Sequence, residues 1–521
     1  MKVLIDKWSK KYSASVKHFD SWKNAFLKLV LNRITLLKKS MKIKPCSSTF
    51  DKKNVKCCLK DLHANYVITP IDKAANNVAF ICKRFYVQTL VKELGISSSN
   101  TDQTYEAIKL TEDQIIKKHT KDIKKLFKID VTETMSVLPE MHWTPKMHKT
   151  PSKARFIVAA SKCTTKELAK DMTSVLKLFY RQIENYHAVG HKMSHIKHFW
   201  IVKNKDPVID SLNRLSSKNR AKSIATYDFS TLYTKIPHDK LLSVFKEITD
   251  FCFNGCADSK ILINDSYARW CHNPEKSTNS KKRLWDKGTV NKSLAYLLDN
   301  CYFAVGENVY KQVIGIPMGT DPAPFMANLF LYYYEDKFMK ELKSKDKKSA
   351  YKFGHVWRYI DDLNAVNNDN IFESNIPNIY PSELELKKEN DGYLNATFLD
   401  LDIKINDKKF SLKLYDKRDD FGFSIVRMPF ASNNMPSSIF YSSFCSELLR
   451  IARCTTGKDD FNSSSEQLLK RMYQQNGENE SKLNRITNCL KKLYTKHLDI
   501  FNKFFDTEKQ LFDKFLLNVR K

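Results

Sequence analysis

Apolar residues recur at two kinds of spacing along this chain, and each spacing predicts one kind of element. From Trp22 to Leu37 the apolar positions follow a helical period with basic residues between them, which predicts a basic amphipathic helix. Such a helix either docks on the body of the protein or contacts nucleic acid, and the pattern leaves both open. Further helices are expected over Asp102–Lys128, Thr165–Tyr186 and Pro324–Met339, and an extended segment over Ala154–Ala160.

Two strand-like runs each lead into acidic residues. Lys222–Thr226 ends at Tyr227-Asp228, and Phe353–Ile360 ends at Asp361-Asp362. The charged stretch Lys343–Lys348 lies between them, has no core residues and predicts a solvated turn. The two strand ends are therefore the first candidates for a site.

The C-terminal third changes from strands to helices. Phe398–Ile405 and Phe410–Tyr415 are typical of hairpin strands around an Asn406-Asp407 turn. Beyond Pro436 the pattern is wholly helical, and it ends in a basic amphipathic run over Lys482–Leu517. These helices are expected to form a separate region.

Length and charge restrict the class of protein. The 521 residues are 42% hydrophobic, enough for several domains with real cores. Lys and Arg number 88 against 58 Asp and Glu, a net charge of +30, and residues 1–60 alone hold 16 basic and 3 acidic side chains. This excess favours a polyanionic partner such as nucleic acid, with a solvated basic surface as the alternative.

Compartment and cysteine chemistry follow from what the sequence lacks. No stretch approaches the roughly 20 apolar residues of a membrane span, and the first residues lack a signal-peptide pattern, so we expect an intracellular protein without a membrane partner. The 12 cysteines show no framework spacing, which favours free thiols. One weak zinc candidate is the cluster Cys252, Cys256, Cys271 and His272.

The carboxylates at the strand ends suit nucleotidyl transfer. Two divalent ions about 3.5–4 Å apart stabilise the attacking and leaving oxygens of such a reaction, and hard cations prefer carboxylate oxygens. Asp228 and Asp361 are separated by 133 residues, but neighbouring strands can bring them together. An Asp-Asp pair alone is a weak signal. The pair after an apolar strand, with Asp228 in a similar position upstream, is a strong one.

Three segments resemble motifs of reverse transcriptases in order and spacing. Tyr227–His238 resembles their first catalytic motif, Gly315–Thr320 the glycine turn that supports template and nucleotide, and Tyr359–Asp362 the signature turn. The amino-acid sequences of these motifs are most similar to those of the Penelope-like retroelements, whose enzymes are similar to telomerase. The resemblance covers roughly Asp61–Cys454 and includes Thr69–Lys73, Pro145–Lys149, Arg155–Ile157 and Phe398–Leu401.

This resemblance implies an α/β (α+β) fold: a right-hand polymerase with fingers, an antiparallel-sheet palm and a helical thumb. The expected domains are a basic helical extension (1–60), fingers (61–220), a palm (221–430, with an insertion at about 240–310) and a thumb (431–521). The segment Leu414–Phe430 is expected to form a hairpin that grips the primer. The implied activity is RNA-directed DNA polymerisation, with dNTPs added to a primer 3′ hydroxyl.

The resemblance also implies roles for single residues. Two Mg²⁺ ions, or Mn²⁺, would be held by Asp228, Asp361, Asp362 and the backbone carbonyl of Phe229. The nucleotide would be bound by Lys149 and Arg155 at its triphosphate, by Tyr233 as the gate that excludes a 2′ hydroxyl, and by Gly319. Tyr233 as a core aromatic is the alternative. Nucleic-acid contacts are expected from Lys73, Lys146, Pro317 and Met318, although Met318 stands where many reverse transcriptases have glutamine.

The expected partners are an RNA template, a DNA primer or RNA–DNA duplex, and dNTPs, in the nucleus; no oligomeric state is predicted. Two other functions compete. An RNA-dependent RNA polymerase shares the palm, and Tyr233 argues against it. A domesticated or decayed copy would bind nucleic acid without catalysis, and the intact carboxylates argue against that.

Overall fold

The computed structural model describes residues 16–40, 52–95, 104–230, 232–256, 260–264, 267–271, 282–317, 319–368, 370–430, 436–476, 480–507 and 510. The chain divides into two compact units, Met1–Tyr66 and Val67–Lys521, and each is described by itself. No helix within the described ranges is both long and apolar enough to cross a membrane.

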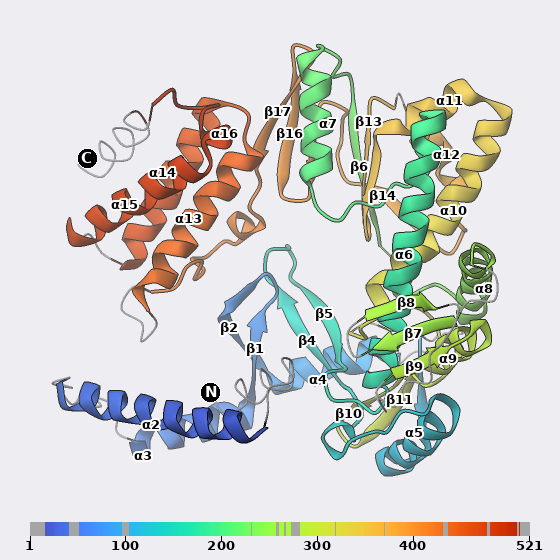
Figure 1. The fold of residues 1–521 in the computed structure, drawn as a ribbon, viewed down its shortest axis with the longest axis vertical. Helices are drawn as coiled ribbons and strands as arrows, with labels where there is room; N and C mark the ends of the chain where they lie inside the picture. The colour runs from blue at the N-terminus through green and yellow to red at the C-terminus, as the bar shows by residue number, and fades with distance from the viewer. Residues whose placement is uncertain are drawn as a thin grey trace. The chain divides into compact units, whose positions relative to one another are not determined.

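The first unit contains the helices α2 (Val16–Ser40) and α3 (Lys52–Asn65) (Figure 1). The helix expected from Trp22 is confirmed and is longer, because no glycine or proline interrupts α2. Trp22 and Phe26 stack one turn apart, with ring centroids 5.3 Å from each other. The apolar stripe seen in the sequence therefore lies along one face of this helix.

A four-stranded antiparallel sheet, the palm sheet, lies in the second unit. Its strand order is β12-β13-β6-β14, from β12 (Val356–Tyr359), β13 (Asp362–Val366), β6 (Ile224–Phe229) and β14 (Leu386–Lys388). The strand expected to end before Asp228 continues through Phe229. Side chains alternate between two faces along these strands, so one strand serves two environments.

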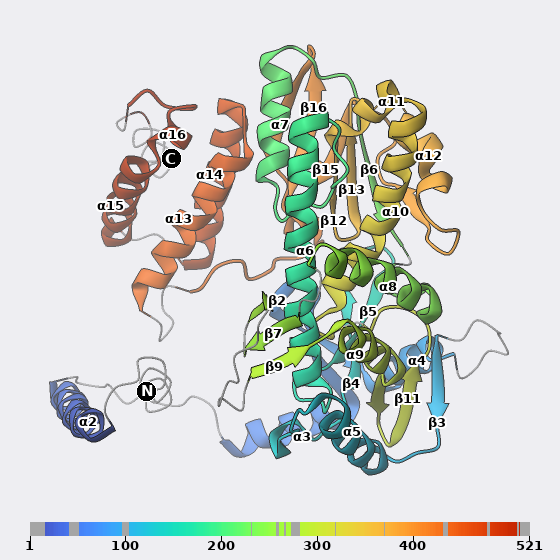
Figure 2. The same cartoon turned by 45° about the vertical axis from the view of Figure 1, so that its right-hand side comes forward.

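Each face of the palm sheet is covered differently. One face shares a large apolar core with α10 (Ala323–Lys345) and α12 (Ile371–Ile379). Part of the other face packs against a three-stranded sheet, which is made of β15 (Asn395–Phe398), β16 (Leu401–Asn406) and β17 (Lys409–Leu414). Figures 1 and 2 show the palm sheet between these two layers. The end of the palm sheet that carries Asp228 and Asp362 lies outside the core shared with β15–β17.

A five-stranded sheet, order β3-β11-β10-β4-β5, combines distant parts of the chain. It is antiparallel except where β10 pairs with β4. Its strands are β3 (Tyr105–Ile108), β11 (Asn308–Gln312), β10 (Tyr302–Val305), β4 (Glu140–Lys146) and β5 (Lys153–Ala159). The extended segment expected near Ala154 is therefore confirmed as β5.

The remaining elements of this unit before residue 430 are a hairpin, a small sheet and several helices. The hairpin joins β1 (Tyr66–Ile71) to β2 (Ala74–Cys82), and the small sheet has the order β8-β7-β9, with β7 (Lys260–Asn264), β8 (Tyr267–Cys271) and β9 (Lys282–Trp285). The helices are α4 (Lys83–Glu93), α5 (Glu112–Phe127), α6 (Lys166–Ser194), α7 (Asp206–Ser217), α8 (His238–Asn254), α9 (Lys287–Asp299) and α11 (Lys347–Tyr351), with 3-10 turns over Glu133–Met135, Lys352–His355 and Lys417–Asp420.

Beyond Pro436 the described chain is helical, as expected. It forms α13 (Ser437–Cys454), α14 (Lys458–Asn476), α15 (Glu480–Lys496) and α16 (Leu498–Phe501), which share a core of their own. The predicted continuous run over Lys482–Leu517 is wrong in its length, since α15 ends at Lys496 and a new short helix follows. Residues 511–517 lie outside the described ranges.

The expected helix over Asp102–Lys128 is wrong in its first part. Tyr105–Ile108 forms β3, because it pairs with β11 at the edge of the five-stranded sheet. The helix starts only at Glu112, where Thr111 and Gln114 form a reciprocal capping box. Tertiary pairing here overrides the local helical pattern.

The segment between α10 and the signature turn also differs from expectation. The helix expected over Pro324–Met339 is confirmed but runs on to Lys345, and the predicted turn over Lys343–Lys348 is mostly helical. Asp346 caps α11 by accepting from two backbone amides. The expected strand Phe353–Ile360 starts only at Val356, because Phe353 is a buried core residue inside a 3-10 turn.

The expected hairpins near the C-terminal end of the palm are partly wrong. The segment Phe398–Ile405 is not one strand, because Leu399 and Asp400 have φ angles of 48° and 63° and turn the chain between β15 and β16. The hairpin around Asn406-Asp407 is confirmed. Residues 415–430 form no hairpin strands; ion pairs such as Arg427 to Asp416, 3.0 Å apart, hold this loop instead.

Candidate functional site: three carboxylates on the palm sheet

Two carboxylate residues lie directly opposite each other on neighbouring palm strands. In the antiparallel register of β13 with β6, Asp362 is the partner of Asp228. Residues paired in this way project to the same face, with Cβ atoms about 4.5–5.5 Å apart. Asp361 precedes β13 in the turn, and its carbonyl accepts a hydrogen bond from the Phe229 amide at 3.3 Å. The sheet thus gathers three carboxylates from two distant segments.

The alternation along β6 separates the core from this site. Tyr227 contacts Phe372, and Phe229 meets Tyr380 edge to face at 4.9 Å between ring centroids, both in the apolar core. Because successive side chains point to opposite faces, Asp228 points away from that core. The apolar residues on either side of Asp228 therefore hold it in place.

A buried arginine supports the turn that carries Asp361. Arg358 is fully buried and forms a bidentate ion pair with Glu335 of α10, at 2.5 and 3.1 Å. Its Nη1 also donates to the Ile360 carbonyl at 3.0 Å. Ile360 has a φ of 55°, which a β-branched residue rarely adopts. The arginine therefore fixes a strained turn next to the carboxylates.

Burial and mutual repulsion act on the carboxylates. Burial raises the pKa of Asp228, and the charges of Asp361 and Glu389 raise it further, while Lys417 opposes them. Burial likewise raises the pKa of Asp362 to about 7, with the charge of Asp361 as the next cause. Part of each shift comes from neighbouring negative charge, which a divalent cation would offset. The donor set thus fits magnesium.

Replacing Asp362 by asparagine is expected to stabilise the metal-free protein at pH 8 by about 1 kcal/mol, because the buried charge disappears. The native pKa of Asp362 is raised above its ordinary value, so the wild type loses stability as the pH rises from about 4 to about 7. Asparagine does not titrate. The advantage of the variant should therefore grow across this window. Urea unfolding in EDTA at pH 5 and pH 8 measures it, and equal differences at both pH values would contradict the assignment.

Basic side chains from three segments gather beside the carboxylates: Lys417 and Lys146 act on Asp228, and Lys73 lies near both lysines. Lys146 ends β4, Lys73 lies in the β1–β2 turn, and Lys417 lies in the loop after β17. Burial lowers the pKa of Lys73, and the charges of Lys417, Lys146 and Arg155 lower it further. Arg155 forms an ion pair with Asp72, 3.0 Å between Nη1 and Oδ1. Such a concentration of cations suits phosphate groups.

Tyr233 lies against the glycine turn. The Ile316 amide donates to the Tyr233 carbonyl at 3.0 Å, and a Cβ on Gly315 would lie 2.2 Å from that oxygen. Gly315 has a φ of 92°, so only glycine suits this contact. Burial raises the pKa of Tyr233 to about 12, with Asp361 as the next cause. All three segments of the reverse-transcriptase resemblance therefore meet near Asp361.

Other predicted residues fall around this centre. Gly319 packs against the backbone of β5, since a Cβ at this position would lie 2.0 Å from the Val158 carbonyl oxygen. Pro317 is buried, and its carbonyl accepts from the Thr320 hydroxyl at 2.9 Å. Lys149 is exposed in the β4–β5 loop. Their contacts with nucleotide or template stay predictions, and Met318 lies outside the described residues.

Sequence reasoning missed Lys417, Glu389 and the Arg358–Glu335 pair. Lys417 sits in an irregular loop where no local pattern marks it, and only its closeness to Asp228 and Asp362 assigns it to the site. Arg358 stands directly before the signature turn, in an otherwise apolar strand. A charged residue at a buried strand position was the signal that could have identified it.

The weak zinc candidate has no support among the described residues. Cys252 is buried in α8, and burial raises the pKa of its thiol. His272 lies outside the described residues. Among the described residues, the side chains placed closely enough to share a metal ion do not include Cys252, Cys256 or Cys271.

Comparison with known proteins identifies the fold. No protein-family model and no curated protein matches the sequence. Telomerase from Candida albicans, solved in complex with a TWJ fragment of telomeric RNA, is 11% identical with a TM-score of 0.53, over 86% of this chain and 70% of that one. Apo telomerase from Candida tropicalis is 12% identical with a TM-score of 0.47, over 83% and 70%. The RNA-dependent RNA polymerase of a human picobirnavirus is 9% identical with a TM-score of 0.39, over 98% and 92%.

At this identity the likeness to the Candida albicans enzyme establishes the fold alone. The predicted fold class is confirmed: a mixed α/β polymerase fold with fingers, an antiparallel-sheet palm and a helical thumb. The comparisons do not assign the chain to the Penelope-like family.

Proposed function

We propose that the protein is an RNA-directed DNA polymerase that extends a primer 3′ hydroxyl with dNTPs. The observation that carries this proposal is the register that sets Asp362 opposite Asp228, with Asp361 in the adjoining turn of a polymerase palm. A protein that only bound nucleic acid would gain nothing from three clustered carboxylates, which repel one another and the phosphate backbone.

Each group of residues at the site has a proposed role. Asp228, Asp361 and Asp362 would hold two magnesium ions, with the Phe229 carbonyl as a further ligand. These ions, when bound, neutralise the triphosphate and lower the pKa of the primer hydroxyl. Lys73, Lys146, Arg155 and Lys417 attract phosphates to the same place. Arg358 keeps the Asp361 turn in one conformation before substrate arrives.

Primer extension on an RNA template with magnesium tests the proposal. We expect extension with dNTPs and little with rNTPs. A preference for rNTPs would instead identify an RNA polymerase. No extension by a protein that binds the primed template well would overturn the proposal in favour of a non-catalytic nucleic-acid-binding protein.

Tyr233 is proposed to select the sugar, since its ring lies near Asp361 and its backbone is fixed by the Gly315 turn. Replacing Tyr233 by alanine should open space for a 2′ hydroxyl and raise the use of rNTPs relative to dNTPs by about tenfold or more. Tyr233→Phe keeps the ring and should keep the discrimination. Single-nucleotide incorporation rates measure both variants, and unchanged selectivity in the alanine variant would assign Tyr233 to the core alone.

The finer assignments rest on sequence. We propose that the chain belongs to a Penelope-like retroelement, because the amino-acid sequences of its motifs resemble those of that family. We also propose that it acts in the nucleus on an RNA template with a DNA primer. The basic segment 1–60 supports the location. Fusing this segment to a fluorescent protein tests it, and a purely cytoplasmic signal would contradict it.

A further inference from the structure

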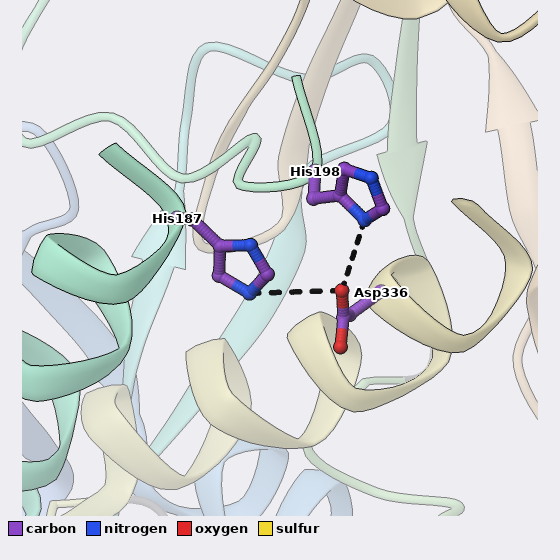
Figure 3. Close-up of side chains that lie close together, drawn as sticks. All are labelled: His187, His198 and Asp336. Carbon is purple, nitrogen blue, oxygen red and sulfur yellow. Dashed lines mark hydrogen bonds and ion pairs between the residues drawn. The ribbon is translucent and has the colours of Figure 1, made fainter. Parts of the chain in front are cut away.

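A cluster of two histidines and one aspartate lies outside the polymerase site. His187 is on α6, Asp336 is on α10, and His198 is in the segment that follows α6 (Figure 3). His187 and Asp336 are buried, and the His198 side chain is 11% exposed. The sequence around them is rich in imidazole, with His191 and His195 also between positions 187 and 198. Among the described residues this is the group whose donor atoms converge on one point.

The distances within the cluster fit a shared cation. Asp336 Oδ1 lies 3.1 Å from His198 Nδ1 and 3.6 Å from His187 Nε2, and the three donor atoms all lie within 4.8 Å of one another. Donors about 2.0–2.1 Å from a tetrahedral zinc ion are separated by roughly 3.4 Å. Figure 3 shows both imidazole rings turned with these nitrogens toward the same carboxylate oxygen. Small side-chain movements would therefore complete three zinc ligands.

The cluster is also accessible from solvent. His187, His191 and His198 line one pocket that opens to solvent. An ion can therefore reach the imidazoles of His187 and His198 from outside. His191 follows His187 by one helical turn on α6, on the same side of the helix. An imidazole or a water molecule from this pocket can supply the fourth ligand of the ion.

Two neighbouring groups contact these ligands. Lys340 Nζ lies 2.7 Å from Asp336 Oδ2, so the lysine occupies the other carboxylate oxygen and leaves Oδ1 for the ion. The Tyr332 hydroxyl lies 2.6 Å from His187 Nε2, the nitrogen that would bind the ion, so metal binding has to displace this hydrogen bond. The positive charge of Lys340 lowers the affinity of the site for a cation. We therefore expect moderate metal affinity.

We propose that His187, His198 and Asp336 form a binding site for a divalent transition metal, with zinc as the expected ion. Two imidazoles and one carboxylate suit zinc, whereas the carboxylate triad of the palm suits magnesium. This site is independent of the proposed polymerase activity. It joins α6, α10 and the segment that precedes Trp200, whose carbonyl accepts from the Arg358 amide at 2.8 Å on the edge of the palm sheet.

A bound ion would therefore stabilise the support of the catalytic turn. Asp336 follows Glu335, the ion-pair partner of Arg358, on α10. Lys197, next to His198, donates to the Val356 carbonyl of β12 at 2.6 Å. Zinc should consequently raise the thermal stability of the whole chain, and the effect should not need nucleotide or template.

Metal binding to the full chain tests the proposal directly. The chain is treated with EDTA, dialysed, and titrated with zinc chloride and separately with cobalt chloride, with excess magnesium present to saturate the carboxylate triad. We expect about one zinc per chain, a rise in melting temperature, and the visible absorption of tetrahedral cobalt. No zinc retained by the wild type, or only the pale spectrum of octahedral cobalt, would overturn the proposal whatever the variants do.

Matched variants locate the ion. His198→Ala and Asp336→Asn should each lose the cobalt absorption and the zinc-dependent rise in melting temperature. His195→Asn removes an exposed imidazole from the same stretch and suits the φ of 57° at this helix end, so it should behave as wild type. Retained binding in His198→Ala would place the metal elsewhere and contradict the assignment. Primer extension by the zinc-free protein keeps this result separate from the test of the polymerase.

Discussion

Asp361→Asn is expected to reduce primer extension by about 10³-fold or more, while the protein keeps its fold and its affinity for primed template. The change removes one negative oxygen from a turn whose backbone is held by Arg358 and by the Phe229 amide. Asparagine has nearly the same shape, so the loss would report on charge at the metal site. Single-turnover extension with saturating dNTPs measures the rate, and a filter-binding assay measures template affinity.

Asp407→Asn is the matched control. Asp407 is also an aspartate in a hairpin turn, but it is exposed and lies between β16 and β17. The same change of charge there should leave extension unchanged. If Asp361→Asn and the control lose activity equally, or if neither does, the carboxylate triad is not the catalytic centre.

Arg358→Met is expected to cost about 3–5 kcal/mol of folding free energy, because it leaves Glu335 buried without its partner. Extension should fall as well, since the Ile360 carbonyl loses its donor next to Asp361. Urea unfolding gives the stability, and extension is measured at a temperature where the variant remains folded. Lys203→Met is the control: it breaks an exposed pair with Glu184 and should change stability by less than about 1 kcal/mol.

A double variant separates stability from positioning. Combining Arg358→Met with Glu335→Gln removes the unpaired charge, and the glutamine can still accept from the Tyr380 hydroxyl, which now bonds Glu335 at 2.9 Å. Much of the stability should return. Extension should stay low, because the turn still lacks its support. Full recovery of activity in the double variant would show that Arg358 acts on stability alone.

The sequence predicted the parts of the site that are local. Asp228 and the Asp361-Asp362 pair were found because each ends or follows a short apolar strand, and β6 and β13 place them together as expected. The long helices were also predicted, since α6 keeps an apolar period over many turns and α10 is apolar on most of its sides. A regular pattern of burial was enough in these places.

The rest depends on contacts that no local pattern contains. β3 looked helical in sequence and became a strand only because β11 lies beside it. The loop over residues 415–430 is held by ion pairs, so the hairpin that the resemblance implied there does not form. Lys417 reaches the carboxylates from this loop, and its position follows from the packing of β15–β17 rather than from its neighbours in sequence.

The pairing of β6 with β13 has a consequence for how the protein matures. The two strands are adjacent in the sheet but are separated by a long stretch that includes α8, α9 and α10. Closing so long a loop is slow, because its entropy must be lost before any pairing stabilises the sheet. During synthesis the three carboxylates therefore cannot come together until β13, which ends at Val366, has left the ribosome. A translation product that ends before β13 would lack Asp362 and the strand that pairs with β6.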